Sequence, residues 1–324
     1  MIARKVAPAL AVGCTFVARP AELTPLSALA MAVLGERAGI PAGVLNVIPS
    51  SDSSGVGKEL CASEKVAKIT FTGSTNVGKI LMRQCSDTIK KMSLELGGNA
   101  PFIVFDDADV DAAVEGAMIA KYRNNGQTCV CANRIYVQSG IYDEFASKLK
   151  EKVIGLNLGN GFANGVTVGP LINEEAVIKV KNHIADAVNK GAKVIEGGDQ
   201  SSLGGTFFRP TILTGVTSEM NIAREETFGP VAPLFRFSNE AEVITMANDS
   251  EFGLASYFYS QDLARVWRVA EALESGMVGI NTGLISTEVA PFGGIKQSGL
   301  GREGSKYGTE DFLDIKYLCM GEIN

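Results

Sequence analysis

The chain has 324 residues, 46% of them hydrophobic and 20% charged, which is the balance of a globular protein long enough for two domains. The formal net charge is −6 without a basic cluster, so nucleic acid is excluded as the main partner. Six irregularly spaced cysteines do not form a disulfide framework, so we expect a reducing compartment, the cytoplasm, or the mitochondrion if a transit peptide precedes Met1.

Residues 1–18 fit two interpretations. Two basic residues followed by an apolar run resemble a short secretory leader. However, Pro8, Gly13 and Cys14 interrupt that run, which is also too short to span a bilayer as a helix. A short helix, a glycine turn and a strand at residues 15–18 fit this segment equally well.

Strands and helices are predicted to alternate through the first 90 residues. The predicted strands cover residues 15–18, 44–48 and 68–71, and the predicted helices cover residues 27–38, 56–62 and 76–87. This alternation is typical of βαβ units with a mostly parallel sheet. Between the last strand and helix lies Phe71-Thr-Gly-Ser74, where a nucleotide phosphate could meet backbone N–H groups. A helix-capping turn explains the same residues equally well.

A second alternating series begins at Pro101. Its predicted strands cover residues 102–105 and 135–137 and a segment after Gly191, and its predicted helices cover residues 110–122, 141–149 and 174–190. We therefore expect a cofactor-type domain at residues 1–96, a catalytic domain at 97–303 and a C-terminal segment at 304–324. Glu95 lies next to the first boundary, and domain boundaries often form small-molecule sites.

Cys129 is the strongest candidate for catalysis. It follows the polar turn Arg123-Asn-Asn-Gly-Gln-Thr, where a substrate could reach the thiol, and Glu95 offers a carboxylate ahead of a glycine pair. A thiolate nucleophile and a carboxylate base together are sufficient for covalent attack on a carbonyl carbon. The alternatives are a cysteine that merely packs, or half of a metal site. The only histidine, His183, lies in a lysine-containing helical stretch and is predicted to be solvated, so we expect no metal site.

Five motifs together resemble those of the NAD(P)-dependent aldehyde dehydrogenases. In order along the chain they are Phe71-Thr-Gly-Ser74, Leu94-Glu-Leu-Gly-Gly98, Gly126-Gln-Thr-Cys129, Glu225-Glu-Thr-Phe-Gly-Pro230 and Pro291-Phe-Gly-Gly-Ile-Lys296. Within that family the chain is most similar to the succinate-semialdehyde dehydrogenase branch. The resemblance implies an α/β fold with a partial Rossmann-type cofactor domain, an α/β catalytic domain and a C-terminal oligomerisation strand at residues 317–320.

The resemblance also implies roles for individual residues. Cys129 would attack the aldehyde, and Glu95 would activate the water that hydrolyses the resulting thioester. The residues that would contact the cofactor are Arg19, Glu22, Gly73, Ser74, Glu226 and Phe228. A carboxylate at Glu22 favours NAD over NADP, although a helix-capping role fits it too. Arg19 departs from the family's usual lysine, which affects the expected geometry of cofactor binding.

The resemblance assigns Arg4, Arg123 and Ser286 to the distal carboxylate of succinate semialdehyde. Arg4 could equally be an ordinary surface charge, and glutarate semialdehyde is an alternative substrate. Cys131 could close a strained, reducible disulfide with Cys129, or simply pack.

Family members are longer than this chain. The absent part includes an asparagine that donates a hydrogen bond to the thiohemiacetal oxyanion. The alternative to an active enzyme is therefore an inactive fragment that associates with full-length subunits. We expect a homo-oligomer, a dimer or a tetramer, and no membrane partner.

Overall fold

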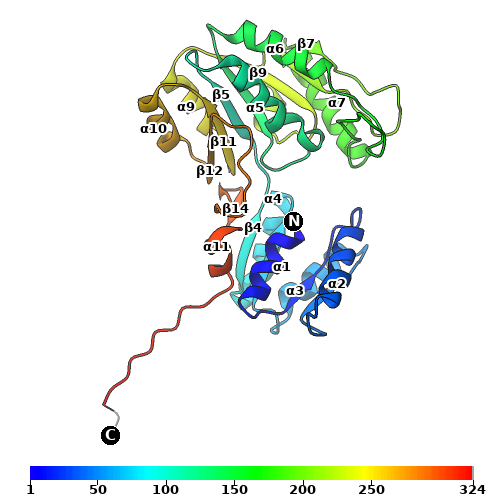
Figure 1. Cartoon of the computed structure of the whole chain (residues 1–324), viewed down its shortest axis with the longest axis vertical. Helices are drawn as coiled ribbons and strands as arrows, with labels where there is room; N and C mark the ends of the chain where they lie inside the picture. Colours follow the sequence, from blue (N-terminus) through cyan, green and yellow to red (C-terminus); the bar gives the residue numbers. More distant parts are fainter. Residues whose placement is uncertain (323–324) are drawn as a thin grey trace. The chain divides into compact units, whose positions relative to one another are not determined.

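The alternating pattern of the first 95 residues folds into two small sheets with helices beside them (Figure 1). The structure, a computed structural model, describes residues 1–322 and separates them into two compact units. The first unit comprises Met1–Glu95, Ser286–Gly293 and the chain from Gly299 onward. The second unit comprises Leu96–Ile285 and Gly294–Ser298.

The first unit contains five strands. They are β1 (Phe16–Ala18), β2 (Leu45–Val47), β3 (Lys68–Thr72), β4 (Lys91–Glu95) and β14 (Gly299–Leu300). Strands β1 and β2 pair in parallel as a sheet of their own. In the other sheet β3 pairs with β4 in parallel, and β4 pairs with β14 in the antiparallel direction. Glu95 is therefore the last residue of the central strand of a three-stranded sheet.

The helices of the first unit follow the predicted pattern. They are α1 (Ile2–Ala11), α2 (Leu26–Arg37), α3 (Ser53–Ala62), α4 (Thr75–Cys85), the short 3-10 helix η1 (Ser86–Thr88) and α11 (Ser305–Glu310). The predicted strands and helices between residues 15 and 87 are confirmed, with their ends displaced by at most three residues. Residues 2–11 form the short helix of the second interpretation, with Lys5, Val6 and Ala9 on its buried side.

The second unit is built on a seven-stranded sheet in the order β12-β11-β5-β6-β9-β8-β7. Its strands are β5 (Ala100–Val104), β6 (Ala132–Gln138), β7 (Lys193–Glu196), β8 (Thr211–Thr214), β9 (Val231–Phe237), β11 (Ala255–Tyr259) and β12 (Met277–Ile280). All neighbours are parallel except β7 and β8. Strands β5 and β11 are buried throughout, which explains why they contain no charged residue and do not alternate between buried and exposed positions.

Helices cover this sheet and complete its core. They are α5 (Val110–Tyr122), the 3-10 helix η2 (Arg123–Gly126), α6 (Tyr142–Ile154), α7 (Glu174–Asn189), α8 (Asn221–Arg224), α9 (Glu240–Asn248) and α10 (Leu263–Ala272). A separate antiparallel pair joins β10 (Phe252–Gly253) to β13 (Ile295–Lys296). Side chains of α7, α9 and α10 share one hydrophobic cluster with Phe105, Phe235 and Phe258. The predicted helices at residues 110–122, 141–149 and 174–190 are thus confirmed.

Residues 313–322 form neither a helix nor a strand. The strand expected at residues 317–320 therefore does not form within a single chain, and its pairing with another subunit stays a prediction. Among the helices of residues 1–322, none is both long and apolar enough to cross a membrane.

Candidate active site

Cys129 lies in a turn that connects the end of α5 to the start of β6. We call residues 123–129 the nucleophile turn. Its backbone is left-handed at Asn124 and Asn125, with φ of 52° and 56°, and at Gly126, with φ of 73°. Asparagine tolerates this conformation better than most residues with a side chain. Both asparagine amides are engaged, because Asn124 Nδ2 donates to the carbonyl of Gln127 and Asn125 Nδ2 to that of Gly169, each at 2.9 Å.

Two glycines allow other segments to approach the nucleophile turn. A Cβ on Gly98 would lie 2.4 Å from the carbonyl oxygen of Cys129, and a Cβ on Gly126 would lie 2.2 Å from that of Gly229. Gly98 and Cys129 come together because they precede β5 and β6, which are parallel neighbours in the sheet. Gly98, the second glycine of the pair after Glu95, is thus packed against the backbone of Cys129.

The two cysteines of Cys129-Val-Cys131 lie in different surroundings. Cys129 is partly exposed, whereas Cys131 is 1% exposed and its thiol donates to the carbonyl of Lys121. Burial raises the pKa of Cys131, so its reactive thiolate form is disfavoured. No disulfide joins any of the six cysteines, all of which lie in the described chain. Cys129 is thus the more accessible thiol of the two.

Glu226 contacts the same region through its carboxylate. Its Oε1 accepts a hydrogen bond from the backbone N–H of Gly98 at 3.0 Å, and burial raises its pKa to about 7. Two residues later, Phe228 is 37% exposed and has a left-handed φ of 53°. In the second unit, the structure thus brings Cys129, Gly98 and Glu226 together.

Glu95 belongs to the first unit, where it is buried and 2% exposed. Burial, and secondarily the negative charge of Glu303, raise its pKa to about 8. Lys5 donates a hydrogen bond to Glu303 Oε1 and opposes this rise. Glu95 Oε2 has no hydrogen-bond partner within residues 1–322, so this oxygen could accept a proton from a water molecule. Sequence reasoning missed Lys5 and Glu303, which lie 298 residues apart in the chain.

The turn after β3, where the sequence suggested a nucleotide phosphate, caps helix α4. Ser74 is the N-cap of α4 and accepts from the backbone N–H of Val77, as the helix-capping interpretation predicted. Beside it, the hydroxyl of Thr72 is buried without a hydrogen-bond partner among the described residues. An unsatisfied buried hydroxyl beside a helix N-terminus fits a bound dinucleotide phosphate. Gly73 donates its N–H to the carbonyl of Glu95, which ties this turn to β4.

Arg19 and Glu22 form an ion pair with 2.6 Å between Nη2 and Oε2. Arg19 also donates to the carbonyl of Ser50, and its Nε is buried without a partner in the described chain. A backbone hydrogen bond and the Arg19 guanidinium lower the pKa of Glu22. The lowered pKa favours the charged form of Glu22, where the resemblance puts the adenosine ribose.

The three residues assigned to the substrate carboxylate belong to different units. Arg4 and Ser286 lie in the first unit, and Arg123 lies exposed in the second. Arg4 is not an isolated surface charge, because its guanidinium lies 4.1 Å from the ring centroid of Phe292 and 3.9 Å from Glu303. Whether these three side chains share one ligand stays a prediction.

The prediction that His183 is solvated is wrong. The residue is 3% exposed, and both of its ring nitrogens lie 3.2 Å from oxygen atoms, Nδ1 from Thr227 and Nε2 from Glu225. The error arose because His183 occupies the buried face of α7 beside lysines that face solvent. Within residues 1–322, no group of three or more His, Cys, Asp or Glu side chains is arranged to hold a metal ion.

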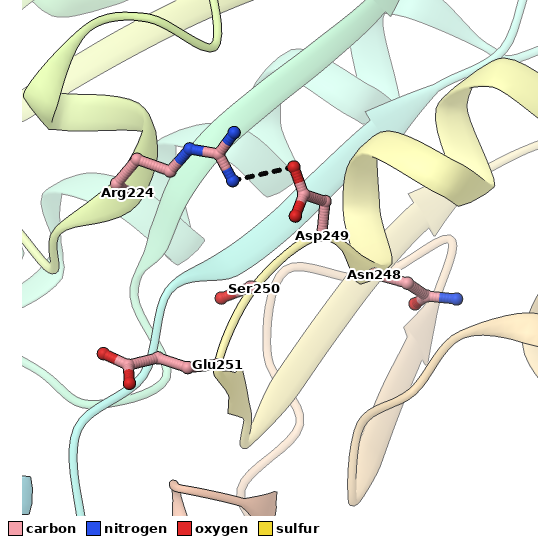
Figure 2. A pocket seen from close by; sticks show the side chains of 5 residues that line it. All are labelled: Arg224, Asn248, Asp249, Ser250 and Glu251. Carbon is pink, nitrogen blue, oxygen red and sulfur yellow. Dashed lines mark hydrogen bonds and ion pairs between the residues drawn. The ribbon is translucent and has the colours of Figure 1, made fainter.

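A polar pocket elsewhere in the second unit contains none of the predicted site residues (Figure 2). Arg224 and Asp249 form an ion pair of 2.7 Å across it. The remaining residues that line it are Asn248, Ser250 and Glu251. Because Arg224 and Asp249 are more than half exposed, their attraction is screened by water.

Residues 1–318 match the model of the aldehyde dehydrogenase family. The chain belongs to the aldehyde dehydrogenase family. It is 68% identical over 323 residues to glutarate-semialdehyde dehydrogenase of Pseudomonas aeruginosa, covering 100% of this chain and 67% of the relative. It is 64% identical to the NADP(+) succinate-semialdehyde dehydrogenase GabD of Escherichia coli and to 3-sulfolactaldehyde dehydrogenase of Pseudomonas putida, covering 66% of each relative and 99% and 100% of this chain.

Among solved structures, succinate-semialdehyde dehydrogenase from Burkholderia pseudomallei superposes with a TM-score of 0.98 at 64% identity. That alignment covers 99% of this chain and 66% of the other. The predicted family and fold class are therefore confirmed. The chain spans about two thirds of the length of the curated relatives that it matches.

Proposed function

We propose that this aldehyde dehydrogenase oxidises a short aldehyde with an anionic group at its far end, with succinate semialdehyde as the substrate and succinate as the product. The observation that carries the proposal is the nucleophile turn, which exposes Cys129 while Cys131 stays buried. The names of the three curated relatives all describe aldehydes with a distal carboxylate or sulfonate. The named substrates differ in length and in the anionic group, and they share an aldehyde with that group at the far end.

The chemistry follows from the residues of each unit. The Cys129 thiolate would attack the aldehyde carbon to give the oxyanion of a thiohemiacetal, and loss of hydride from that oxyanion would leave a thioester on Cys129. Aldehyde dehydrogenases of this kind use NAD or NADP, which accepts that hydride when bound. Glu95 would then take a proton from water, whose oxygen attacks the thioester and releases the carboxylic acid and the Cys129 thiolate, while that proton stays on Glu95.

A separate set of residues would hold the cofactor. The Gly73–Ser74 turn would bind the pyrophosphate, and the carboxylate of Glu226 with the ring of Phe228 would contact the nicotinamide ribose. The unsatisfied Thr72 hydroxyl and Arg19 Nε support this assignment for the first unit. The charged Glu22 would accept hydrogen bonds from the adenosine ribose and repel a 2′-phosphate, which favours NAD.

Trapping of the covalent intermediate tests the proposal. The chain is mixed with NAD and succinate semialdehyde, quenched in acid and digested, and the peptides are analysed by mass spectrometry. A succinyl thioester is expected on Cys129 in the parent and in Cys131→Ala, and not in Cys129→Ala. A thioester on Cys131, or on neither cysteine, would contradict the proposed chemistry.

The substrate class is tested with Arg123. We expect Arg123→Gln to lower the yield of thioester from succinate semialdehyde about tenfold, because a charge-assisted hydrogen bond to the carboxylate is lost. Butanal, which has no carboxylate, serves as the control and should react equally with both proteins. An equal loss of thioester yield for both aldehydes would show that Arg123 does not recognise the carboxylate of the substrate.

A further inference from the structure

The only histidine of the chain, His183, forms hydrogen bonds with the two residues that flank Glu226. We call residues 225–229 the cofactor turn. His183 Nε2 lies 3.2 Å from Glu225 Oε2, and Nδ1 lies 3.2 Å from Thr227 Oγ1. A carboxylate only accepts hydrogen bonds, so Nε2 carries the proton and Nδ1 of the neutral ring accepts from the Thr227 hydroxyl. Burial lowers the pKa of His183, which keeps the ring neutral at neutral pH.

The hydrogen bonds of His183 select which way Glu226 points. The backbone is extended at Glu225, with φ of −105° and ψ of 140°, and successive side chains of an extended segment point to opposite sides. Glu225 and Thr227 both reach His183, and Glu226, between them, points to the N–H of Gly98. A shift by one residue would turn Glu226 away from Gly98.

Helix α7 makes a second contact with the cofactor turn. A Cβ on Gly229 would lie 2.5 Å from Cγ2 of Val180, one helical turn before His183. The carbonyl of Gly229 in turn faces Gly126 of the nucleophile turn. Phe228 lies between Thr227 and Gly229 and keeps a left-handed backbone, which a residue with a side chain maintains only when its surroundings hold it.

We propose that His183 is a positioning residue for the dinucleotide: it bridges Glu225 and Thr227 and so holds Glu226 and Phe228 where the nicotinamide ribose binds. This inference rests on the proposed function, which assigns Glu226 and Phe228 to the cofactor. His183 itself is buried and contacts the cofactor turn from α7, so its effect on the cofactor is indirect.

Two measurements test the proposal in the 324-residue chain. The first is hydrogen exchange of the Gly98 amide, which reports the Glu226 hydrogen bond without any cofactor. The second is the Kd of NADH from fluorescence titration. His183→Phe keeps a ring and loses both hydrogen bonds, and we expect about tenfold faster Gly98 exchange and about tenfold weaker NADH binding. His183→Gln retains one donor and should recover part of both effects.

Tyr142→Phe is the matched control. The buried Tyr142 hydroxyl donates to the carbonyl of Leu234 and accepts from the N–H of Gly215, so this variant loses comparable hydrogen bonds away from the cofactor turn. It should lower the melting temperature and leave Gly98 exchange and NADH binding unchanged. Equal effects in His183→Phe and Tyr142→Phe, or no effect of His183→Phe, would overturn the proposal.

The outcome also separates this inference from the proposed function. A parent chain that binds no NADH would refute cofactor binding by this chain. Hydrogen exchange of the Gly98 amide would then test the positioning role of His183 without the cofactor. Unchanged exchange in His183→Phe overturns that role, and faster exchange in His183→Phe but not in Tyr142→Phe supports it.

Discussion

Glu95 is buried at the end of β4, where its ionised form is costly. Its pKa is raised to about 8 by burial and by Glu303, above the ordinary value of 4.5. Between these two pH values the folded chain binds more protons at Glu95 than the unfolded chain does. The contribution of this residue to stability therefore falls as pH rises from about 4.5 to about 8.

We predict that Glu95→Gln raises the melting temperature by a few degrees at pH 9 and changes it little at pH 4. The neutral amide avoids the cost of a buried negative charge, which the parent chain carries only at high pH. Thermal melts across this pH range measure the effect, and Glu310→Gln on α11 is a control outside the Glu95 network. An equal shift at both pH values would show that the charge of Glu95 is not responsible.

Glu22 and Arg19 set the expected choice between the two dinucleotides. Glu22→Gln would remove the negative charge beside the ribose and release Arg19 from its ion pair. We expect the ratio of the Kd values for NADPH and NADH to fall about tenfold, because a 2′-phosphate would gain a charge-assisted hydrogen bond from Arg19. Fluorescence titration with both dinucleotides measures this ratio. An unchanged ratio would show that Glu22 takes no part in recognising the ribose.

At the scale of elements, neighbouring segments approach the backbone of the nucleophile turn closely. We predict that Gly98→Ala slows the alkylation of Cys129 by iodoacetamide at least severalfold or destabilises the chain, because its Cβ would lie 2.4 Å from the Cys129 carbonyl. Gly140→Ala is the control, since a Cβ there meets nothing within 4 Å. Peptide mapping of the labelled protein gives the rate at Cys129. Identical behaviour of the two variants would mean that the turn adapts freely.

Most elements before residue 196 could be predicted because each one is specified locally. Apolar runs mark β1 and β5, and helical periodicity marks α5 and α7. The site could be predicted only as separate motifs. The contacts of Lys5 with Glu303, of Glu226 with Gly98 and of His183 with Thr227 join residues 298, 128 and 44 positions apart. No local pattern specifies such pairs, so the environment of each titratable group required the structure.

At the scale of the whole molecule, the proposed chemistry is divided between two units. The nucleophile and Glu226 lie in the second unit, and Glu95 lies in the first with the turns that would bind the pyrophosphate and adenosine. The first unit also exposes apolar side chains, with Leu26 and Leu34 of α2 exposed by 77% and 60%. Exposed apolar surface of this kind marks an interaction site or a liability to aggregation.

We predict that the 324-residue chain reacts at Cys129 but turns over slowly. The partly exposed thiol should be alkylated by iodoacetamide, and one thioester per chain is enough for the trapping experiment. Repeated turnover needs a stabilised oxyanion, and the amides of Asn124 and Asn125 near Cys129 each give one of their two N–H groups to a backbone carbonyl, which fixes their orientation. Steady-state formation of NADH from succinate semialdehyde, followed with the N-terminus verified as Met1, should therefore stay well below the roughly 1–10³ per second of typical enzymes. A rate within that range would show that a group of this chain stabilises the oxyanion, and Asn124→Ala and Asn125→Ala would then identify whether either amide leaves its carbonyl to do so.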